Sequence, residues 1–373
     1  MSDNGTLFTP LTLPCGLVLK NRLSLAPMTT WSSNFDGTIH EDEIHYLKRR
    51  SAGLGMAMTA ACYVHPDGYA FHQQWGCHSD EMIQSLRLVA DTIRSQGARP
   101  ILQIHHGGRM CPSELLGRQP VSASAVAALR PDADVPRPLT ENEIWETIEA
   151  FGEATRRAIE AGYDGVEIHG ANTYLLQQFF SPHINRRTDE WGGSIQQRMR
   201  FPLEVLRAVR RIADGGPDTF AVGYRLSPEE IEEPGITIDD TLELTDALVN
   251  EGLDWLHISV RDYWKGSIRD KSDTTRPSTR IVERIDGRVP VIGVGKVYTP
   301  EDAEFVLNDG CSIVALGRIL LMEPEWAMKV SSGKSDTIRV TLPAEGGTDQ
   351  LTLPEPLYKR LLEVKGWLPV DRG

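Results

Sequence analysis

One pattern recurs along most of this chain: a short apolar run, then a turn or loop, then an amphipathic helical stretch. The eight apolar runs cover residues 22–28, 56–64, 100–106, 165–170, 220–227, 255–260, 289–295 and 312–318. They are short, several are rich in Val and Ile, and many are bounded by Gly or Pro, as is typical of buried parallel strands. Because right-handed βα crossovers repeated eight times close most naturally into a ring, the pattern predicts an α/β fold of the (β/α)8 TIM-barrel type.

Helix start signals lie between the predicted strands. Thr140 and Glu143 form a capping-box pattern that opens a helix running to about Gly162, and Thr299-Pro300-Glu301-Asp302 is typical of another helix start. Further helical spacing covers 80–96, 194–213, 239–250 and 277–286. A doubly wound sheet is the alternative, but that fold favours a Gly-x-Gly-x-x-Gly fingerprint after the first strand, and none occurs there.

The chain shows no composition break and no linker, so we expect residues 1–373 to form a single domain. The barrel core is predicted at about 20–333 and a C-terminal extension at about 334–373. The segment 11–19 precedes the first strand, and we expect it to form a hairpin that plugs the N-terminal end of the barrel. The tail from Leu353, with Trp367 and Arg372, is expected either to fold onto its own barrel or to reach a neighbouring copy.

Composition excludes several classes of partner. The net charge is −13, from 39 Lys+Arg against 52 Asp+Glu, which argues against nucleic acid or an anionic membrane surface as a partner. No apolar run approaches the ~20 residues of a bilayer span, and no secretory signal is recognisable, so we expect a cytoplasmic protein. Five widely spaced cysteines form no Cys-x-x-Cys pair, which argues against zinc-ribbon and clustered iron–sulfur sites.

In such a barrel, function lies at the carboxyl ends of the strands, and unusual polar residues gather there in this sequence. Strand one ends in Ala26-Pro27-Met28-Thr29 and strand two ends near Ala61. Gln103 and Arg225 each interrupt an apolar strand. A Gln alone is as readily a structural contact as a ligand contact. A guanidinium inside a barrel needs an internal salt bridge or an anion at the barrel mouth.

Two weak signals reinforce each other at the last two strands. These strands end in Gly293-Val294-Gly295 and Leu316-Gly317-Arg318. The loops after strands seven and eight form the common phosphate site of TIM barrels, and Arg318 can add a charged contact. The combination of Val294, Gly295, Gly317 and Arg318 therefore predicts a phosphorylated cofactor across the barrel mouth.

Three residues beyond the fourth strand have catalytic chemistry. His169 and Asn172 can both donate a hydrogen bond to one carbonyl oxygen and so polarise it. Tyr174 is a phenol, largely protonated at neutral pH, and can donate a proton. Any one of these residues alone is more often loop packing, but the three at this spacing favour catalysis.

Other polar and aromatic residues say less about the function. His105-His106, Trp31 and the Tyr263-Trp264 pair could line a substrate pocket or cover the barrel rim. We interpret Asp239-Asp240 and Glu229-Glu230 as helix-start acids and solvated faces.

These residues taken together resemble the Old Yellow Enzyme family of FMN-dependent ene-reductases, from Leu7 to about Trp326. The most specific match is the His-x-x-Asn-x-Tyr spacing of His169, Asn172 and Tyr174. The matching segments are 19–22, 26–29, 103–109, 165–179 and 185–194.

The resemblance implies a tightly but non-covalently bound FMN. Its binding residues would be Ala26, Pro27, Met28, Thr29, Ala61, Gln103, Arg225, Val294, Gly295, Gly317 and Arg318. Within this set, Thr29 would tune the flavin from its C4 carbonyl, Gln103 would bind the pyrimidine edge, and Arg225 would stabilise the reduced ring. His169 and Asn172 would bind the substrate carbonyl, and Trp31 would line the substrate pocket.

The implied reaction is ping-pong oxidoreduction. NADPH or NADH would reduce FMN and leave, and an activated alkene, an α,β-unsaturated carbonyl or nitro compound, would then take the hydride at its β-carbon. Tyr174 would protonate the α-carbon. Relatives are often dimers, so a homodimer is one expected assembly.

The sequence departs from the family at Thr173, where glycine is frequent, which puts the presentation of Tyr174 in doubt. Two other function classes stay open. One is a metal-dependent barrel lyase or hydrolase that uses His105, His106 and His169 as ligands. The other is a flavin-binding barrel with a non-catalytic sensing role.

Overall fold

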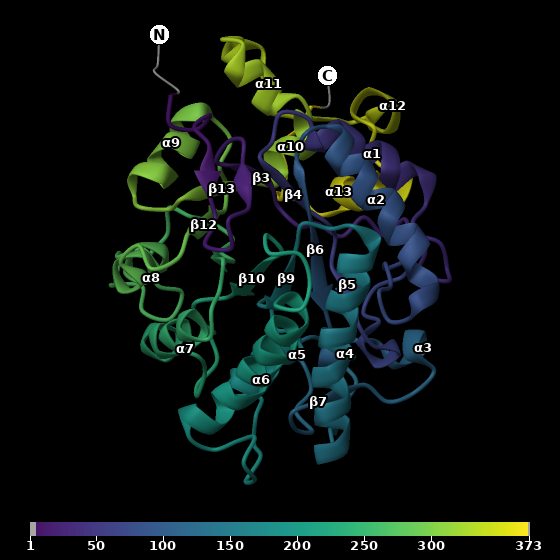
Figure 1. The fold of residues 1–373 in the computed structure, drawn as a ribbon, viewed down its shortest axis with the longest axis vertical. Helices are drawn as coiled ribbons and strands as arrows, with labels where there is room; N and C mark the ends of the chain where they lie inside the picture. Colours follow the sequence, from purple (N-terminus) through teal and green to yellow (C-terminus); the bar gives the residue numbers. More distant parts are fainter. Residues whose placement is uncertain (1–4, 372–373) are drawn as a thin grey trace.

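The computed structural model describes residues 5–371, and within them eight parallel strands close into a barrel (Figure 1). The order of strands around the barrel follows the chain, and pairing of β13 with β3 closes the ring. The predicted TIM barrel is therefore confirmed. The strands are β3 (Leu23–Leu25), β4 (Met56–Met58), β6 (Arg99–His105), β9 (Gly165–Gly170), β10 (Ala221–Leu226), β11 (Trp255–Ile258), β12 (Val291–Val294) and β13 (Ile313–Leu316).

The predicted second strand, 56–64, is wrong as one element. It divides into β4 and β5 (Cys62–Tyr63), both of which pair with β6. At the break, the hydroxyl of Thr59 accepts the hydrogen bond from the backbone N–H of Gln103 at 3.1 Å. A side-chain oxygen thus replaces a backbone carbonyl in the ladder, and the strand is interrupted there.

Helices cover the outside of the barrel (Figure 1), and their starts follow the predicted caps. Thr140 with Glu143 and Thr299 with Asp302 each form a capping box in the structure. The main outer helices are α1 (Glu41–Ser51), α2 (Ile83–Ser95), α4 (Glu141–Ala161), α6 (Ile195–Ala213), α7 (Ile238–Asn250), α8 (Pro277–Ile285), α9 (Pro300–Asn308) and α11 (Trp326–Ser331).

Short elements decorate the loops and the C-terminal segment. The loop after β6 holds α3 (Ser113–Leu116), β7 (Val121–Ser122) and β8 (Arg137–Pro138), while α5 (Leu175–Phe180) follows β9 and α10 (Arg318–Met322) follows β13. Single 3₁₀ turns are η1 (Pro66–Gly68), η2 (Asp80–Met82), η3 (Gly108–Met110) and η4 (Ser335–Thr337). The C-terminal segment contains β14 (Leu342–Pro343), α12 (Gly347–Leu351), α13 (Glu355–Glu363) and β15 (Val370–Asp371).

The predicted hairpin precedes the barrel as β1 (Leu11–Thr12) and β2 (Val18–Leu19). Its residues Leu13, Leu17 and Leu19 are buried in one cluster with inward side chains of the strands, among them Met56 and Trp255. The hairpin therefore closes the N-terminal end of the barrel with apolar side chains, as expected.

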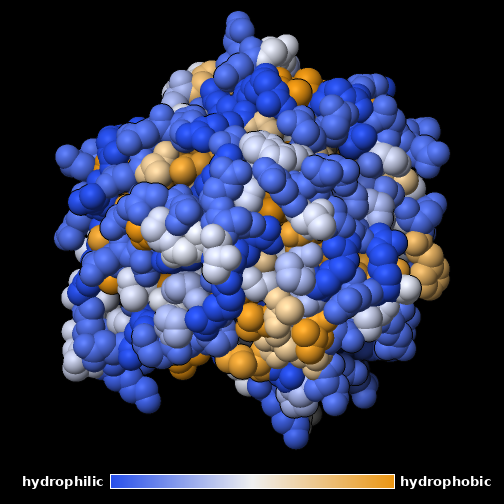
Figure 2. Space-filling model, turned by 90° about the horizontal axis from the view of Figure 1, so that it is seen from below, coloured by the Kyte–Doolittle hydropathy of each residue, from blue (hydrophilic) through white to orange (hydrophobic). Residues whose placement is uncertain are grey.

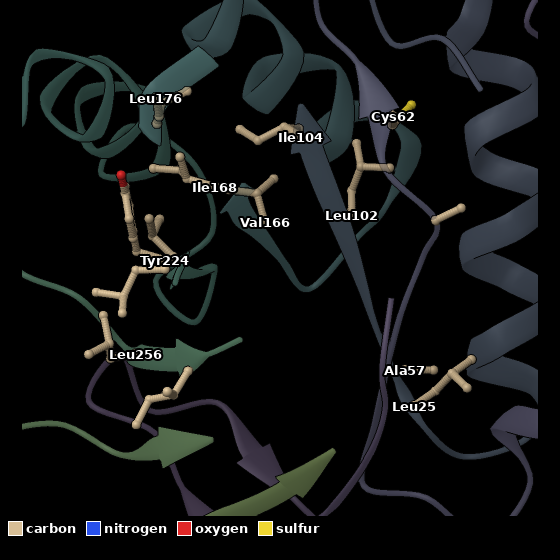
Figure 3. Close-up of a cluster of buried hydrophobic side chains, with 14 of the residues drawn as sticks. Leu25, Ala57, Cys62, Leu102, Ile104, Val166, Ile168, Leu176, Tyr224 and Leu256 are labelled. Atoms are coloured by element: carbon tan, nitrogen blue, oxygen red, sulfur yellow. The ribbon is translucent and has the colours of Figure 1, made fainter. Parts of the chain in front are cut away.

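A second and larger core separates the barrel from its helices. Alternate residues of each strand point outward, so successive strands contribute one continuous belt of apolar side chains (Figure 3). The belt includes Leu25, Ala57, Leu102, Ile104, Val166, Ile168, Tyr224 and Leu256, and Leu176 of α5 packs against it. The rigid barrel that results fixes the strand ends on which the site is built.

Arg50 of α1 attaches the C-terminal segment to the barrel. This side chain is fully buried, and its guanidinium donates to the carbonyl oxygens of Leu320, Leu351 and Thr352. Figure 1 accordingly shows α12 and α13 beside α1 and α10. The tail thus folds onto its own barrel, while Arg372, named with it in the sequence analysis, lies outside the described residues.

The face in Figure 2 is largely hydrophilic, with hydrophobic residues gathered in a few patches. None of the helices found within residues 5–371 combines the length and the apolar character needed to cross a membrane.

Candidate active site

A cavity of about 180 Å³ opens where strands β10, β12 and β13 end beside the residues that follow β3. All of the predicted cofactor residues line it except Thr29, Ala61 and Gln103. The lining consists of Ala26, Pro27, Met28, Arg225, Val260, Arg261, Val294, Gly295, Lys296, Val297, Ala315, Gly317, Arg318 and Trp367. Folding therefore brings together four separate stretches of sequence that were predicted to bind the same ligand.

Arg225 is the buried one of the four cationic residues that line this cavity. Its side chain is 92% buried, and its Nε has no hydrogen-bond partner within the described part of the chain. Burial lowers the pKa of Arg225, and the negative charge of Glu167 opposes that effect. A buried guanidinium without acceptors is costly. The cavity therefore suits a ligand that presents oxygen or nitrogen acceptors to Arg225.

Gly295 provides backbone access to the other end of the cavity. Its φ is +126°, and a Cβ atom there would lie 2.9 Å from both the backbone nitrogen of Tyr263 and the carbonyl oxygen of Val260. Only glycine fits this conformation without moving backbone. Arg318 begins the short helix α10 directly after Gly317. Loops after the last two strands and a short helix form the usual phosphate cradle of a TIM barrel.

Glu167 is a buried residue of the site that the sequence analysis did not single out. It is fully buried inside the barrel and accepts hydrogen bonds from Gln103 Nε2 (2.8 Å), Trp255 Nε1 (3.0 Å) and His257 Nδ1 (2.9 Å). Burial raises its pKa, but His257 and Arg225 outweigh burial, so the pKa of Glu167 lies below its usual value. The amide nitrogen of Gln103 thus donates to Glu167, and its carbonyl oxygen is available to accept from a ligand.

Alternation along the strand could have identified Glu167. Residues two apart in a strand face the same side, so Glu167 shares the inward face with His169. Arg225 is the register partner of His169 on the neighbouring strand. A carboxylate on the inward face, two residues before a candidate catalytic His, was a recognisable signal.

Ala61 and Thr29 lie outside the lining of the cavity. The carbonyl of Ala61 accepts a hydrogen bond from Gln74 Nε2 at 3.0 Å, which leaves the Ala61 N–H as the backbone group that can serve a ligand. Thr29 directly follows the cavity residue Met28 and is half-buried. No side chain or backbone group among residues 5–371 makes a hydrogen bond with the Thr29 hydroxyl.

His169, Tyr174 and His105 pack edge to face as one aromatic group. The ring centroids are 4.9 Å apart for His169 and Tyr174, and 4.4 Å apart for His105 and Tyr174. His169 Nδ1 accepts from the backbone N–H of Ala171 at 3.3 Å, which selects the tautomer with the proton on Nε2. Burial holds the pKa of His169 well below its usual value and raises the pKa of Tyr174. Both rings are therefore neutral hydrogen-bond donors.

Asn172 stands beside this group in a left-handed turn. Its φ is 57°, its backbone N–H donates to the Ser227 hydroxyl at 2.9 Å, and its Oδ1 accepts from the Ser259 hydroxyl at 3.0 Å. With Oδ1 engaged, the amide Nδ2 is the group left to donate. Thr173 also has a positive φ, 66°, although a β-branched residue is strained there.

Trp31 joins the site through Phe71, which the sequence did not single out. The Trp31 and Phe71 rings are 6.3 Å apart, and Phe71 lies 6.0 Å from Tyr174. The guanidinium of Arg360, on α13, covers the other side of Trp31 at 4.6 Å from its ring centroid.

The C-terminal segment also reaches the cofactor cavity. Trp367 is part of the lining, and the Arg318 guanidinium lies 5.8 Å from its ring centroid. Contacts that link positions almost fifty residues apart leave no periodic trace in a sequence, so this contribution could not be predicted.

Glu229-Glu230 and Tyr263 have structural roles in the fold. The interpretation of Glu229-Glu230 as solvated acids is wrong, because both are buried and Glu230 accepts from Gln177 Nε2 (2.8 Å) and Ser181 Oγ (2.6 Å). Tyr263 is a structural residue whose hydroxyl donates to Asp309 at 2.9 Å.

The metal-barrel alternative finds no geometric support. Across residues 5–371, no three His, Cys, Asp or Glu side chains converge as ligands would. His106 Nδ1 accepts from the backbone N–H of Gly108, so it serves the local turn.

Comparison with known proteins agrees with the site. Residues 6–337 match the model of the NADH:flavin oxidoreductase / NADH oxidase family. The chain is 45% identical over 367 residues to a probable NADH-dependent flavin oxidoreductase of Bacillus subtilis, covering 97% of each chain. It is 43% identical to the NADH:fumarate oxidoreductase of Klebsiella pneumoniae, where the match covers 96% of this chain but only 39% of that protein.

A solved structure extends the likeness to three dimensions. The Old Yellow Enzyme homologue from Zymomonas mobilis superimposes with a TM-score of 0.77 at 25% identity, over 88% of this chain and 93% of that one. FMN fits the residues present, because Arg225 lacks an acceptor and the Gly295 turn leaves backbone exposed to a phosphate. The chain belongs to the NADH:flavin oxidoreductase / NADH oxidase family, that of Old Yellow Enzyme, and is an FMN-dependent oxidoreductase that uses NADH or NADPH.

Proposed function

We propose that this enzyme reduces alkenes conjugated to a carbonyl or nitro group in a ping-pong reaction, with NAD(P)H as the reductant. The observation that carries the proposal is the group of His169, Asn172 and Tyr174, in which His169 is the register partner of Arg225, a residue that lines the cavity. Bound FMN supplies the hydride chemistry, taking a hydride from the nicotinamide and passing it to the alkene.

Arg225 and Gln103 hold the flavin electrostatically in this proposal. The unpartnered Arg225 guanidinium would serve the flavin edge where negative charge gathers on reduction, and the Gln103 carbonyl oxygen would accept from the ring. Ala26, Pro27, Met28, Thr29 and the N–H of Ala61 would hold the ring. Val294, Gly295, Gly317 and Arg318 would bind the phosphate.

His169 and Asn172 bind the carbonyl oxygen of the alkene. His169 Nε2–H and Asn172 Nδ2–H are both available, because the opposite atom of each side chain is already engaged within the protein. Two donors on one oxygen withdraw electrons from the conjugated double bond, and this makes its β-carbon electrophilic. Trp31 and Phe71 form the apolar side of the same pocket.

Tyr174 supplies the proton in this scheme. Burial raises the pKa of its phenol, so the hydroxyl carries its proton at neutral pH. Its ring is held edge-on between His105 and His169, which fixes its direction.

Fumarate, in the name of the Klebsiella relative, is an alkene conjugated to carboxyl groups. Because this chain spans 39% of that protein, the name supports the class of acceptor and no particular substrate.

The test separates the two half-reactions in Tyr174→Phe. We expect reduction of the flavin by NADH, followed anaerobically by loss of its visible absorbance, to proceed at the wild-type rate. Reoxidation by cyclohexenone should slow by about 10²-fold or more. Tyr358→Phe is the matched control, because its hydroxyl donates to the Pro343 carbonyl in the C-terminal segment. Equal slowing of both half-reactions would remove Tyr174 from the role of proton donor.

A further inference from the structure

A second cavity, of about 440 Å³, adjoins the cofactor cavity and has no role in the scheme above. It lies between the loops that follow β10 and β11, and Val260 and Arg261 line both cavities. Ser227 and Ser259, which hold Asn172, also line it. The cavity therefore adjoins both the cofactor cavity and the residues that position Asn172.

The lining combines apolar surface with two cations that have no ion-pair partner and with the carboxylates of Glu229 and Asp262, both of which already have partners within the protein. Pro228, Val260, Ile268 and Pro277 form apolar walls, and Ile268 is 53% exposed although it is aliphatic. Arg261 and Lys265 also line the cavity. Neither side chain has an ion-pair partner within 4.0 Å in the part of the chain that the structure describes. Asp262, the nearest acid in the loop, is already paired with Lys296 at 2.9 Å.

The wall carrying these residues is held in place from within. Glu229 is buried, and its two carboxylate oxygens accept from the Ser267 hydroxyl (2.8 Å) and the Ile268 backbone N–H (3.0 Å). The loop after β11 is thus tied to the loop after β10. A site of this kind is formed before any ligand arrives, which lowers the ordering cost of binding.

We propose that this cavity binds the adenosine diphosphate half of the nicotinamide dinucleotide. Because Val260 and Arg261 line both cavities, a dinucleotide whose nicotinamide lies at the flavin can extend its remaining part into the second cavity. The apolar walls suit the adenine ring, and Lys265 with Arg261 suits the two negative charges of the pyrophosphate. On a chain with net charge −13, two unpaired cations beside an apolar cavity select for an anionic ligand.

The decisive experiment compares NADH with reduced nicotinamide mononucleotide, which lacks the adenosine half. Both are mixed anaerobically with the holoenzyme, and flavin reduction is followed in a stopped-flow instrument. The wild type should use NADH at least tenfold more efficiently. Lys265→Glu should lower the efficiency with NADH about tenfold, through the apparent dissociation constant, and should leave the mononucleotide unaffected.

Lys271→Glu is the matched control, because it makes the same charge change in the same loop outside the cavity lining. It should behave as the wild type does with both donors. Equal efficiency of the two donors in the wild type, or equal loss with both donors in Lys265→Glu, would overturn the proposal.

A measurement on the wild type alone keeps the proposal falsifiable if the variant does not fold. ADP-ribose should compete with NADH for flavin reduction and should not compete with the mononucleotide. Lack of competition at millimolar ADP-ribose would also overturn it. These readouts involve only the reductive half-reaction, so they stand apart from the proposed reduction of alkenes.

Discussion

Glu167 and His257, two strands apart, share a 2.9 Å hydrogen bond in the barrel interior, and the strand between them carries Arg225. The carboxylate and the guanidinium are the opposite charges of the buried site, and the guanidinium alone lines the cofactor cavity. No hydrogen bond joins them within residues 5–371, so they act on each other through space. The balance between them sets how much positive charge the cavity presents to a ligand.

Changing this balance should change the reduction potential of the flavin. Glu167→Gln removes the negative charge, so negative charge gained on reduction is better stabilised and the midpoint potential should rise. Arg225→Ala should lower it. Dye equilibration under anaerobic conditions measures both. Shifts in the same direction would contradict this electrostatic account. We also expect Glu167→Gln to lose about 1–3 kcal/mol of stability, since buried donors lose a charged acceptor.

Acid should unfold this protein from an unusually high pH. Burial holds four histidines neutral in the native state: it lowers the pKa of His105 to about 3 and keeps the pKa of His106, His169 and His257 below the usual value. In the unfolded chain they titrate near 6.5. Below that pH the unfolded state binds more protons, so the free energy of unfolding falls as pH falls.

The expected slope is about 1.4 kcal/mol per pH unit for each of these histidines between pH 6.5 and its native pKa. Urea unfolding at a series of pH values from 7.5 to 4.5 measures it. His105→Gln should reduce the slope by one proton. His45→Gln, at an exposed position on α1, is the matched control. A stability that is flat from pH 7.5 to 5 would contradict burial of the neutral rings.

Thr173 is predicted to be a site of removable strain. It adopts φ 66°, and its side chain makes no hydrogen bond with any described residue, whereas its backbone N–H donates to Gln177 Oε1 at 2.9 Å. Thr173→Gly should therefore stabilise the protein by about 1 kcal/mol, measured by urea unfolding. The same change at Thr92, inside α2, should destabilise it by a similar amount. Destabilisation at both positions would contradict the strain.

The sequence predicted what depends on local period and spacing. Apolar runs located all eight barrel strands, and capping boxes located helix starts such as Thr140 to within a residue. The Gly295 and Gly317-Arg318 loops were predicted because they directly follow the last two strands, where TIM barrels usually bind phosphate. The prediction of one second strand failed at Thr59. Its side chain replaces a backbone acceptor, but in the sequence it looks like any other threonine in an apolar run.

Features set by tertiary packing were missed or misread. Glu229 and Glu230 look solvated in a polar stretch, and only the fold shows that both are buried beneath the rim loops. Phe71 is one apolar residue among many until it lies between Trp31 and Tyr174. The donors to Glu167 come from two other strands, β6 and β11, so no single segment contains these hydrogen bonds.

The C-terminal segment should govern retention of the cofactor, because Trp367 lines its cavity beside Arg318. Trp367→Ala removes an aromatic wall and a cation–π contact, which we expect to weaken FMN binding about tenfold, or about 1.4 kcal/mol. Titration of the apoprotein with FMN, followed by flavin fluorescence, measures this. Trp145→Ala on α4 is the control, since its ring packs against Trp191 instead of the cavity. If Trp145→Ala weakened FMN binding and Trp367→Ala did not, the tail would have no part in holding the flavin.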